Sequence, residues 1–97
     1  MSVVMAMHWP EATKEQYNAL RELVGWERDA PPGGRMHIAW LGDDGFRVVD
    51  VWDTAEQFQT FVETRLMPGV QQVGVEGQPK VQFHELVGAW APERFNA

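Results

Sequence analysis

Residues 35–53, RMHIAWLGDDGFRVVDVWD, decide the fold of this chain. Two strand-like runs rich in β-branched and aromatic residues, 35–41 and 46–53, flank the sequence Gly-Asp-Asp-Gly at positions 42–45. Asp and Gly at these positions suit a tight turn that needs a residue in a left-handed conformation. The stretch therefore predicts a β-hairpin, and the other elements can be placed relative to it.

Two helices are predicted by their capping signals. Thr13 heads the sequence Thr-Lys-Glu-Gln, and Thr54 heads Thr-Ala-Glu-Gln. In such a pattern the hydroxyl and the amide can satisfy two backbone N–H groups at the start of a helix. Apolar residues follow at helical spacing up to a Gly in the first case and a Pro in the second. We expect helices over 13–24 and 55–67, the second with room for one more turn to Gln72.

Two further strands complete the predicted order. The apolar run 3–8 ends just before Pro10, which cannot donate to a strand ladder, and 81–87 forms a last strand-like run. The order is βαββαβ, so we expect one α+β domain over residues 1–97, with a four-stranded antiparallel sheet and both helices on one face.

The hairpin strands are apolar on both faces, which predicts a homodimer. Met36, Ile38 and Trp40 share one parity of the first strand, while Ala39 and Leu41 share the other. Two helices can cover only one face of a four-stranded sheet, so the second face should meet a partner sheet. The tail 88–97 contains Trp90 and Phe95, and we expect it to dock on its own subunit or on the partner.

Composition excludes several classes of function. The net charge is −6 and no two Lys or Arg residues are adjacent, which argues against nucleic acid as a partner. The chain has no Cys, so disulfides and thiolate chemistry are absent, as in a reducing compartment. No basic leader and no apolar run of membrane-spanning length is present, and we expect a cytoplasmic protein without membrane contacts.

The familiar cofactor and hydrolase motifs are also missing. No glycine-rich phosphate loop supports a nucleotide cofactor, and Ser2, the one serine, has no nucleophile elbow around it. The three His stand on separate strands without His-x-His or His-Glu-x-x-His spacing, so we expect no metal site.

Residues 45–58, GFRVVDVWDTAEQF, followed by Phe61 and by Leu-Met-Pro at 66–68, resemble the dimeric α+β barrel superfamily, and in particular its antibiotic-biosynthesis-monooxygenase-like proteins. In that family a strand ends in Trp, here Trp52, and a Ser or Thr, here Thr54, caps the next helix. The similarity in element order covers nearly the whole chain, whereas the motif is confined to about residues 45–68.

This resemblance implies two ferredoxin-like subunits that join their sheets, with a small-molecule cavity between sheet and helices in each subunit. Members include cofactor-free oxygenases, polyketide cyclases, isomerases, heme-degrading enzymes and proteins without known activity. The heme-degrading members carry an Asn, a Trp and a His at places that here hold His8, Phe61 and about Gln71, so none of the three matches. Fold analogy alone does not choose among the other activities.

Titratable residues that interrupt the apolar strands are the candidate catalytic groups: His8, His37, Asp50, His84 and Glu85. An imidazole is readily poised as a base, and a carboxylate beside it fixes its tautomer and stabilises its charged form. We select His37, Asp50 and His8 as catalytic candidates. The alternatives are a hydrogen-bonded sheet histidine at the dimer seam for His37, an ion-paired carboxylate for Asp50 and a turn-capping histidine for His8.

The register of the hairpin decides whether His37 and Asp50 can form such a pair. If residues 42 and 45 pair, His37 lies opposite Asp50. If the turn is instead a type I turn followed by a bulge, His37 meets Val51, and Asp50 is left as an unpaired carboxylate on an apolar face. The sequence leaves both registers open.

Aromatic side chains are the candidate substrate-binding groups. We expect Trp52, Trp40 and Phe61 to hold a substrate ring, with Tyr17 and His84 as further contacts, although large aromatics in a small domain are more often core. The sequence thus predicts a cofactor-independent oxygenase, cyclase or isomerase that removes a proton from an aromatic or polyketide-like molecule. The alternative is a non-catalytic ligand-binding or structural dimer.

Overall fold

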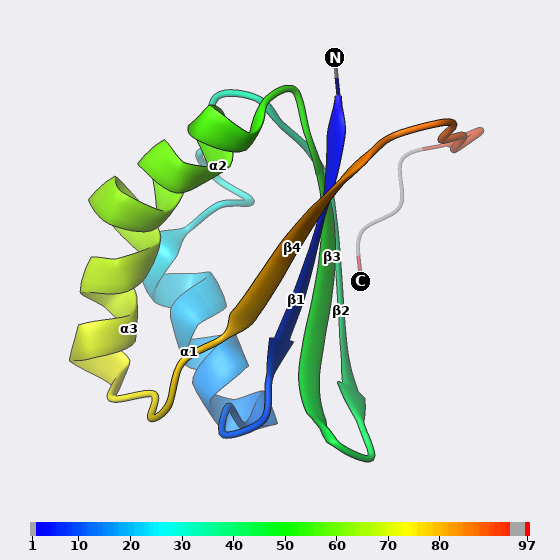
Figure 1. Ribbon diagram of the computed structural model, residues 1–97. Helices are drawn as coiled ribbons and strands as arrows, with labels where there is room; N and C mark the ends of the chain where they lie inside the picture. The colour runs from blue at the N-terminus through cyan, green and yellow to red at the C-terminus, as the bar shows by residue number, and fades with distance from the viewer. Residues whose placement is uncertain (1, 94–96) are drawn as a thin grey trace.

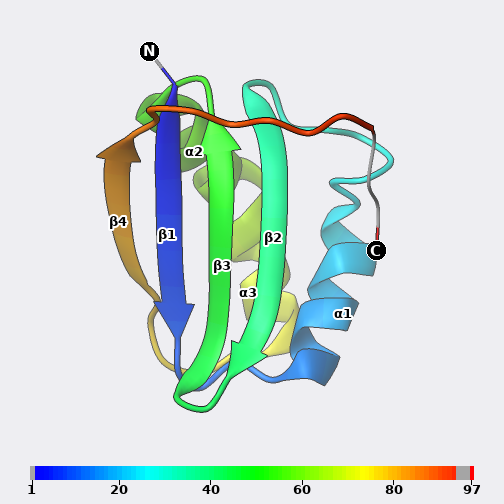
Figure 2. The same ribbon diagram turned by 90° about the vertical axis from the view of Figure 1, so that its right-hand side faces the viewer.

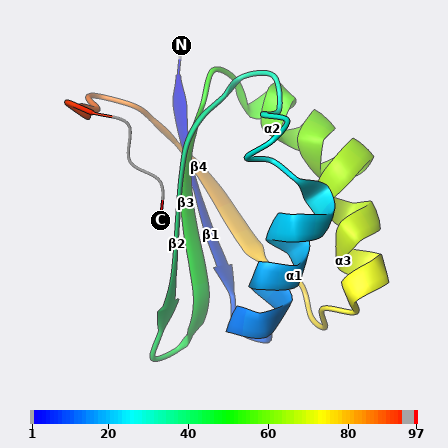
Figure 3. The same cartoon turned by 180° about the vertical axis from the view of Figure 1, so that it is seen from behind.

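The computed structural model describes residues 2–93 and residue 97, and it has the predicted βαββαβ order (Figure 1). The strands and helices are β1 (Val3–Trp9), α1 (Lys14–Val24), β2 (Gly34–Gly42), β3 (Gly45–Trp52), a second helix built from α2 (Ala55–Phe61), η1 (Val62–Leu66) and α3 (Met67–Val73), and β4 (Lys80–Glu85). The four strands form one antiparallel sheet in the order β2-β3-β1-β4. All helices lie on one side of it, as Figures 1 and 3 show, which confirms the predicted α+β fold.

Both predicted helix starts are confirmed. The Thr13 hydroxyl accepts a hydrogen bond from the Gln16 backbone N–H at 3.1 Å, and the Gln16 side chain accepts one from the Thr13 N–H at 3.0 Å. The Thr54 hydroxyl accepts from the Gln57 N–H in the same way at 3.2 Å. The first helix ends at Gly25, whose φ of 70° is left-handed, as the C-terminal signal predicted.

The second helix includes the further turn to Gln72 that the sequence allowed beyond the range 55–67, and it ends one residue later. It continues past Pro68 to Val73, and the five residues before α3, Val62–Leu66, form a π turn. In this turn the Met67 N–H bonds to the Val62 carbonyl, one residue farther back than in an α-helix. Pro68 has no N–H to donate to the preceding turn. Because the π turn before it is wider, Pro68 starts a new α-helical segment instead of ending the helix.

The hairpin adopts the first of the two registers that the sequence left open. Gly42 pairs with Gly45 across a two-residue turn, and His37 pairs with Asp50. Gly45 has a φ of 120°, a conformation that favours glycine, and a Cβ there would lie 2.5 Å from the Pro10 Cα. The register is therefore held by a close approach to the end of β1 as well as by the turn.

The core lies between the sheet and the helices. The buried residues of the inner sheet face alternate along β1 and β3 and meet buried side chains of all the helices: Met5, Trp9, Phe46, Val48 and Trp52 from the strands, and Leu20, Phe58, Phe61 and Val70 from the helices. One polar residue, Asp50, is buried among them with 7% of its surface exposed. The alternation confirms that one face of the sheet is packed against the helices.

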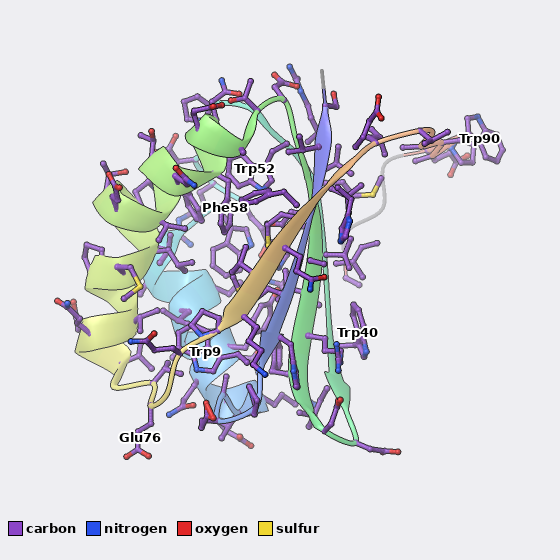
Figure 4. The ribbon with its side chains drawn as sticks, in the orientation of Figure 1. Trp9, Trp40, Trp52, Phe58, Glu76 and Trp90 are labelled. Carbon is purple, nitrogen blue, oxygen red and sulfur yellow. The ribbon has the colours of Figure 1, made fainter. Side chains whose placement is uncertain are left out.

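The opposite face of the sheet, here called the outer face, is covered by no helix or strand in the described part of the chain (Figure 1). Its residues Met36, Ile38 and Trp40 are 37%, 52% and 44% exposed. The segment after β4 passes over this side, as Figure 2 shows, but Trp90 stands off it with 85% of its surface exposed (Figure 4). Trp90 thus does not dock on its own subunit, and Phe95 lies outside the described residues. Among the described helices, none combines the length and apolar character that crossing a bilayer requires.

Candidate functional site

A cavity of about 230 Å³ lies between the inner face of the sheet and the helices. Its wall is mainly apolar and aromatic, with side chains from β1, α1, β3 and the second helix, and from the 25–33 loop that leads into β2. Gln16 and Arg35 lie among the lining residues, and Tyr17 of α1, His37 of β2 and Asp50 of β3 come together there as one hydrogen-bonded cluster. This cluster is the candidate site.

Strand register places the central pair. His37 and Asp50 are cross-strand partners on the inner face, and the imidazole Nδ1 lies 2.7 Å from the carboxylate Oδ1. The His37 side chain is 32% exposed, whereas that of Asp50 is only 9% exposed. The imidazole is therefore accessible while the carboxylate behind it is shielded from solvent.

The pair is extended at both ends by further hydrogen bonds. The Tyr17 hydroxyl lies 2.7 Å from His37 Nε2, and the Trp52 indole N–H donates to the second carboxylate oxygen of Asp50 at 3.0 Å. Tyr17, His37, Asp50 and Trp52 thus form one chain of hydrogen bonds, here called the Tyr–His–Asp–Trp relay. It joins α1 to two strands and ends in the core.

The chemistry of the four groups assigns the protons along the relay. The Trp52 indole can only donate, so Asp50 accepts there, and as a carboxylate it also accepts from His37 Nδ1–H. A neutral His37 protonated at Nδ1 has a bare Nε2, which accepts the Tyr17 proton. Burial raises the pKa of the Tyr17 hydroxyl above its usual value, and the charges of Glu27 and Asp50 add to this while Arg21 opposes it. Tyr17 therefore stays protonated at neutral pH and can act as the donor.

Aromatic rings surround the accessible end of the relay. The Tyr17 ring stacks on Phe46 with a centroid distance of 4.9 Å, and the Trp26 ring lies 5.3 Å from the imidazole of His37. Trp52 lies 5.5 Å from Phe58 and 5.6 Å from Phe61, and all three line the cavity. Figure 4 shows Trp52 and Phe58 between the sheet and the helices. A flat ligand in the cavity would meet aromatic rings beside a single polar group.

Five of the residues expected from the sequence meet at this cavity: His37, Asp50, Tyr17, Trp52 and Phe61. The other three, His8, Trp40 and His84, belong to the opposite parity of their strands and lie toward the outer face. None of these three lines the cavity, and Figure 4 shows Trp40 on the side of the sheet away from the helices. Our expectation that these three residues line the cavity was wrong, because successive side chains of a strand point to opposite faces of the sheet.

His8 has a structural partner at its place in the sheet. Its Nε2 donates to the Asp44 carbonyl at 2.8 Å, so it caps the hairpin turn, which is the alternative weighed for it above. His84 pairs with Val4 on the neighbouring strand β1 and is exposed.

Trp26 is a cavity residue that the sequence did not indicate. It follows the helix-ending Gly25 in a segment rich in Pro and Gly, where no periodicity tells which side chain turns inward. Two features together could have identified it: Trp26 directly follows a helix C-cap, and the helix before it carries the inward-facing Tyr17.

Metal binding finds no support in the part of the chain that the structure describes. No group of three or more His, Asp or Glu side chains there is placed to hold an ion. The Asp50 oxygens are occupied by His37 and Trp52, which leaves the pair oriented for proton transfer between side chains.

Comparison with known proteins identifies the fold. No protein-family model matches the sequence, and no curated protein matches it. Solved structures do match: SnoaB, a cofactor-independent oxygenase from Streptomyces nogalater, has a TM-score of 0.66 at 12% identity over 95% of this chain and 98% of that one. An antibiotic biosynthesis monooxygenase has a TM-score of 0.63 at 19% identity over 91% of this chain and 100% of that one.

A protein of unknown function from Nitrosomonas europaea is similar to the same degree, with a TM-score of 0.61 at 18% identity over 95% of this chain and 94% of that one. The fold is thus the ferredoxin-like α+β fold of the antibiotic-biosynthesis-monooxygenase-like proteins. At these identities the likeness extends to the fold and leaves the chemistry to be argued from the cavity itself.

Proposed function

We propose that this protein is a cofactor-independent enzyme that removes a proton from an aromatic or polyketide-like small molecule bound in the cavity. The observation that carries the proposal is the hydrogen-bonded chain of Tyr17, His37 and Asp50 at the wall of a mainly apolar cavity. The fold shared with SnoaB, a cofactor-independent oxygenase, supports the same class of reaction.

The proton path follows from the order of the groups. A substrate O–H or activated C–H next to Tyr17 gives its proton to the phenol oxygen, while the phenol proton passes over 2.7 Å to His37 Nε2. The imidazolium so formed is stabilised by Asp50, 2.7 Å away at Nδ1. Tyr17 is left holding the substrate's proton and donates a hydrogen bond to the new anion. A substrate that displaces the Tyr17 hydroxyl from Nε2 could instead transfer its proton to His37 directly.

The anion produced by this step can follow two courses. It can rearrange or cyclise and then take the proton back from the relay. It can also add to dioxygen through carbon as a peroxide, which loses water to leave a carbonyl, so that a CH2 group and O2 become C=O and H2O. In both courses the residues of the chain supply proton transfer and orientation, and the electrons come from the substrate.

We also propose that the working form is a homodimer joined through the outer face. The apolar side chains that point outward from β1, β2 and β3 form a continuous surface on this face: Val4, Ala6, Met36, Ile38, Trp40, Val49 and Val51. A second copy of the same sheet is apolar in the same way and would cover it. The exposed Trp90 extends on the same side (Figure 4) and is available to such a partner.

Deuterium exchange tests the proton abstraction without requiring knowledge of the natural product. 8-Hydroxy-2-tetralone carries a hydroxyl beside an activated CH2 on a two-ring skeleton, and exchange of this CH2 in heavy water is followed by NMR. The protein should accelerate this exchange, and His37→Gln should reduce the acceleration about 100-fold or more, as expected when a general base is removed. Asp50→Asn should reduce it less, because the imidazole remains.

A matched control is His84→Gln, which alters a histidine that does not line the cavity. It should leave the exchange rate unchanged. A His37→Gln protein that is folded and keeps the full rate would overturn the proposal. Binding of 8-hydroxy-2-tetralone without any acceleration would instead favour a protein that only holds its ligand.

A further inference from the structure

We infer that the cavity selects a neutral, compact aromatic molecule of one or two fused rings whose hydroxyl donates a hydrogen bond to the Tyr17 oxygen. This inference names a substrate class for the proposed function and rests on it for the reaction. It concerns binding, however, and is tested by binding alone.

Cavity size sets the number of rings. A cavity of about 150 Å³ lined by aliphatic and aromatic side chains is sufficient to hold benzene. The space here is about 230 Å³, which accommodates a second fused ring. A skeleton of three or four rings would leave its additional rings in water and gain little from them.

The relay sets the polar end of the ligand. Both oxygens of Asp50 and both nitrogens of His37 have partners within the relay, and the Tyr17 proton is given to His37 Nε2. What the relay still offers is a lone pair on the Tyr17 oxygen, which can only accept. A ligand hydroxyl is complementary to this acceptor, whereas a carbonyl or an ether in the same place meets another acceptor.

The charge around the cavity selects against anions. Asp50 brings a carboxylate into the wall, and the chain as a whole carries a net charge of −6. Arg35 also lines the cavity, but its guanidinium is bound to both oxygens of Asp53, at 2.8 and 2.7 Å, so its charge is already compensated. A ligand carboxylate would have to leave water without a free cation to receive it.

The rings that line the cavity select an aromatic body over a saturated one. Tyr17, Trp26, Phe46, Trp52, Phe58 and Phe61 all contribute to the wall. Aromatic pairs gain from stacked and edge-on contacts beyond the area that they bury. A flat ring system therefore fits this wall better than a puckered skeleton of the same outline.

Titration calorimetry with a series of simple probes tests these statements. β-Naphthol should bind roughly tenfold more tightly than phenol, from the extra area that the second ring buries, while anthrol should gain nothing further. Methoxynaphthalene, which lacks the donor, should bind roughly threefold to tenfold more weakly than naphthol. Decahydronaphthol and naphthoate should bind more weakly still.

Two variants assign these preferences to the residues named. The triple variant Tyr17→Phe, His37→Leu, Asp50→Leu removes every acceptor of the relay, including the His37 Nε2 that Tyr17→Phe alone would free, so naphthol and methoxynaphthalene should bind it equally. Leu66→Ala enlarges the cavity from the helix side and should raise the affinity for anthrol relative to naphthol. Circular dichroism and thermal unfolding establish that each variant is folded before binding is compared.

The inference and the proposed function fail in different ways. Tight binding of naphthol with the stated preferences but no proton exchange would overturn the proposed enzyme and support the ligand class. Proton exchange on a three-ring or four-ring substrate, with naphthol bound no better than phenol, would overturn the ligand class and support the enzyme. Equal affinity of wild type for naphthol and methoxynaphthalene would also overturn the ligand class.

Discussion

His37 faces Asp50 across the β2–β3 ladder, with 2.7 Å between the imidazole Nδ1 and the carboxylate Oδ1. In the sequence each of them is one of several titratable residues that interrupt apolar strands, and nothing there shows that these two meet. Their pairing makes a base whose tautomer is determined, because Asp50 is held from its other side by the Trp52 indole at 3.0 Å. The predictions below follow from this pair and from its surroundings.

The tautomer of His37 should depend on Asp50. In the wild-type protein we expect Nδ1 to carry the proton and Nε2 to be bare, which nitrogen NMR of the ring distinguishes. Asp50→Asn offers His37 either an oxygen or an NH2 group, so the mutant ring should show a mixture of tautomers or the reverse one. A wild-type ring protonated at Nε2 would contradict the proton assignment along the relay.

Tyr17 should titrate above the usual range. It is the single tyrosine of the chain, so the absorbance of tyrosinate reports it alone. Burial raises its pKa, and the Asp50 carboxylate contributes to the increase, so the midpoint should exceed 10.0 in the folded protein and fall in Asp50→Asn. In denaturant the midpoint should return to the ordinary value.

The same shift determines how stability changes in alkali. A group whose pKa is raised in the folded state stabilises that state below the unfolded pKa, and the contribution is lost as pH rises toward the folded pKa. The free energy of unfolding should therefore decrease as pH rises above 10.0, and Tyr17→Phe should remove this part of the decrease. An unchanged alkaline limb in Tyr17→Phe would assign the decrease to other groups.

Asp53 should stabilise the folded protein at neutral pH, and this contribution should be lost in acid. Hydrogen bonds from Arg35 lower the pKa of the Asp53 carboxyl below 3.8. The stabilisation is present above the unfolded pKa and is lost as pH falls through the folded pKa. Urea unfolding between neutral pH and strong acid should show this loss, and Asp53→Asn should reduce it. Arg35→Gln should have the same effect, and the double variant should add nothing further.

Gly45 should tolerate no side chain. Its φ of 120° is strained for alanine, at a cost of roughly 1–3 kcal/mol, and the added Cβ would also collide with the Pro10 backbone. Gly74→Ala is the matched control, because its φ of 85° is also positive but nothing lies within 4 Å of the new Cβ. Thermal unfolding should show a larger loss for Gly45→Ala. Equal losses would mean that the contact with Pro10 does not matter.

The outer face should set the oligomeric state. Ile38 is 52% exposed on this face, and Ile38→Glu would place a charge at the centre of the proposed dimer seam. We expect the wild type to sediment as a dimer and the variant as a monomer. Gln72→Glu, which adds the same charge at an exposed position of α3 on the helix side, controls for charge alone. A monomeric wild type would contradict the proposed dimer.

Much of this protein can be predicted from its sequence, because the signals involved are local. Thr13 and Thr54 cap helices through bonds to residues three positions along the chain, and Gly42 to Gly45 make a turn within four residues. The sequence left the end of the second helix open between Met67 and Gln72, because Pro68 is a local signal for a helix end that a π turn overcomes.

The site was decided by tertiary structure, since its members are distant in sequence. Two registers of the hairpin were consistent with the sequence, and a change of one residue would have turned Asp50 away from His37. Tyr17 reaches His37 only because α1 packs over the inner face, and Trp26 enters the cavity from an irregular loop. The residue types needed for proton transfer were visible in the sequence. Which of them meet depends on the strand faces and on helix packing, both of which arise from contacts across the fold.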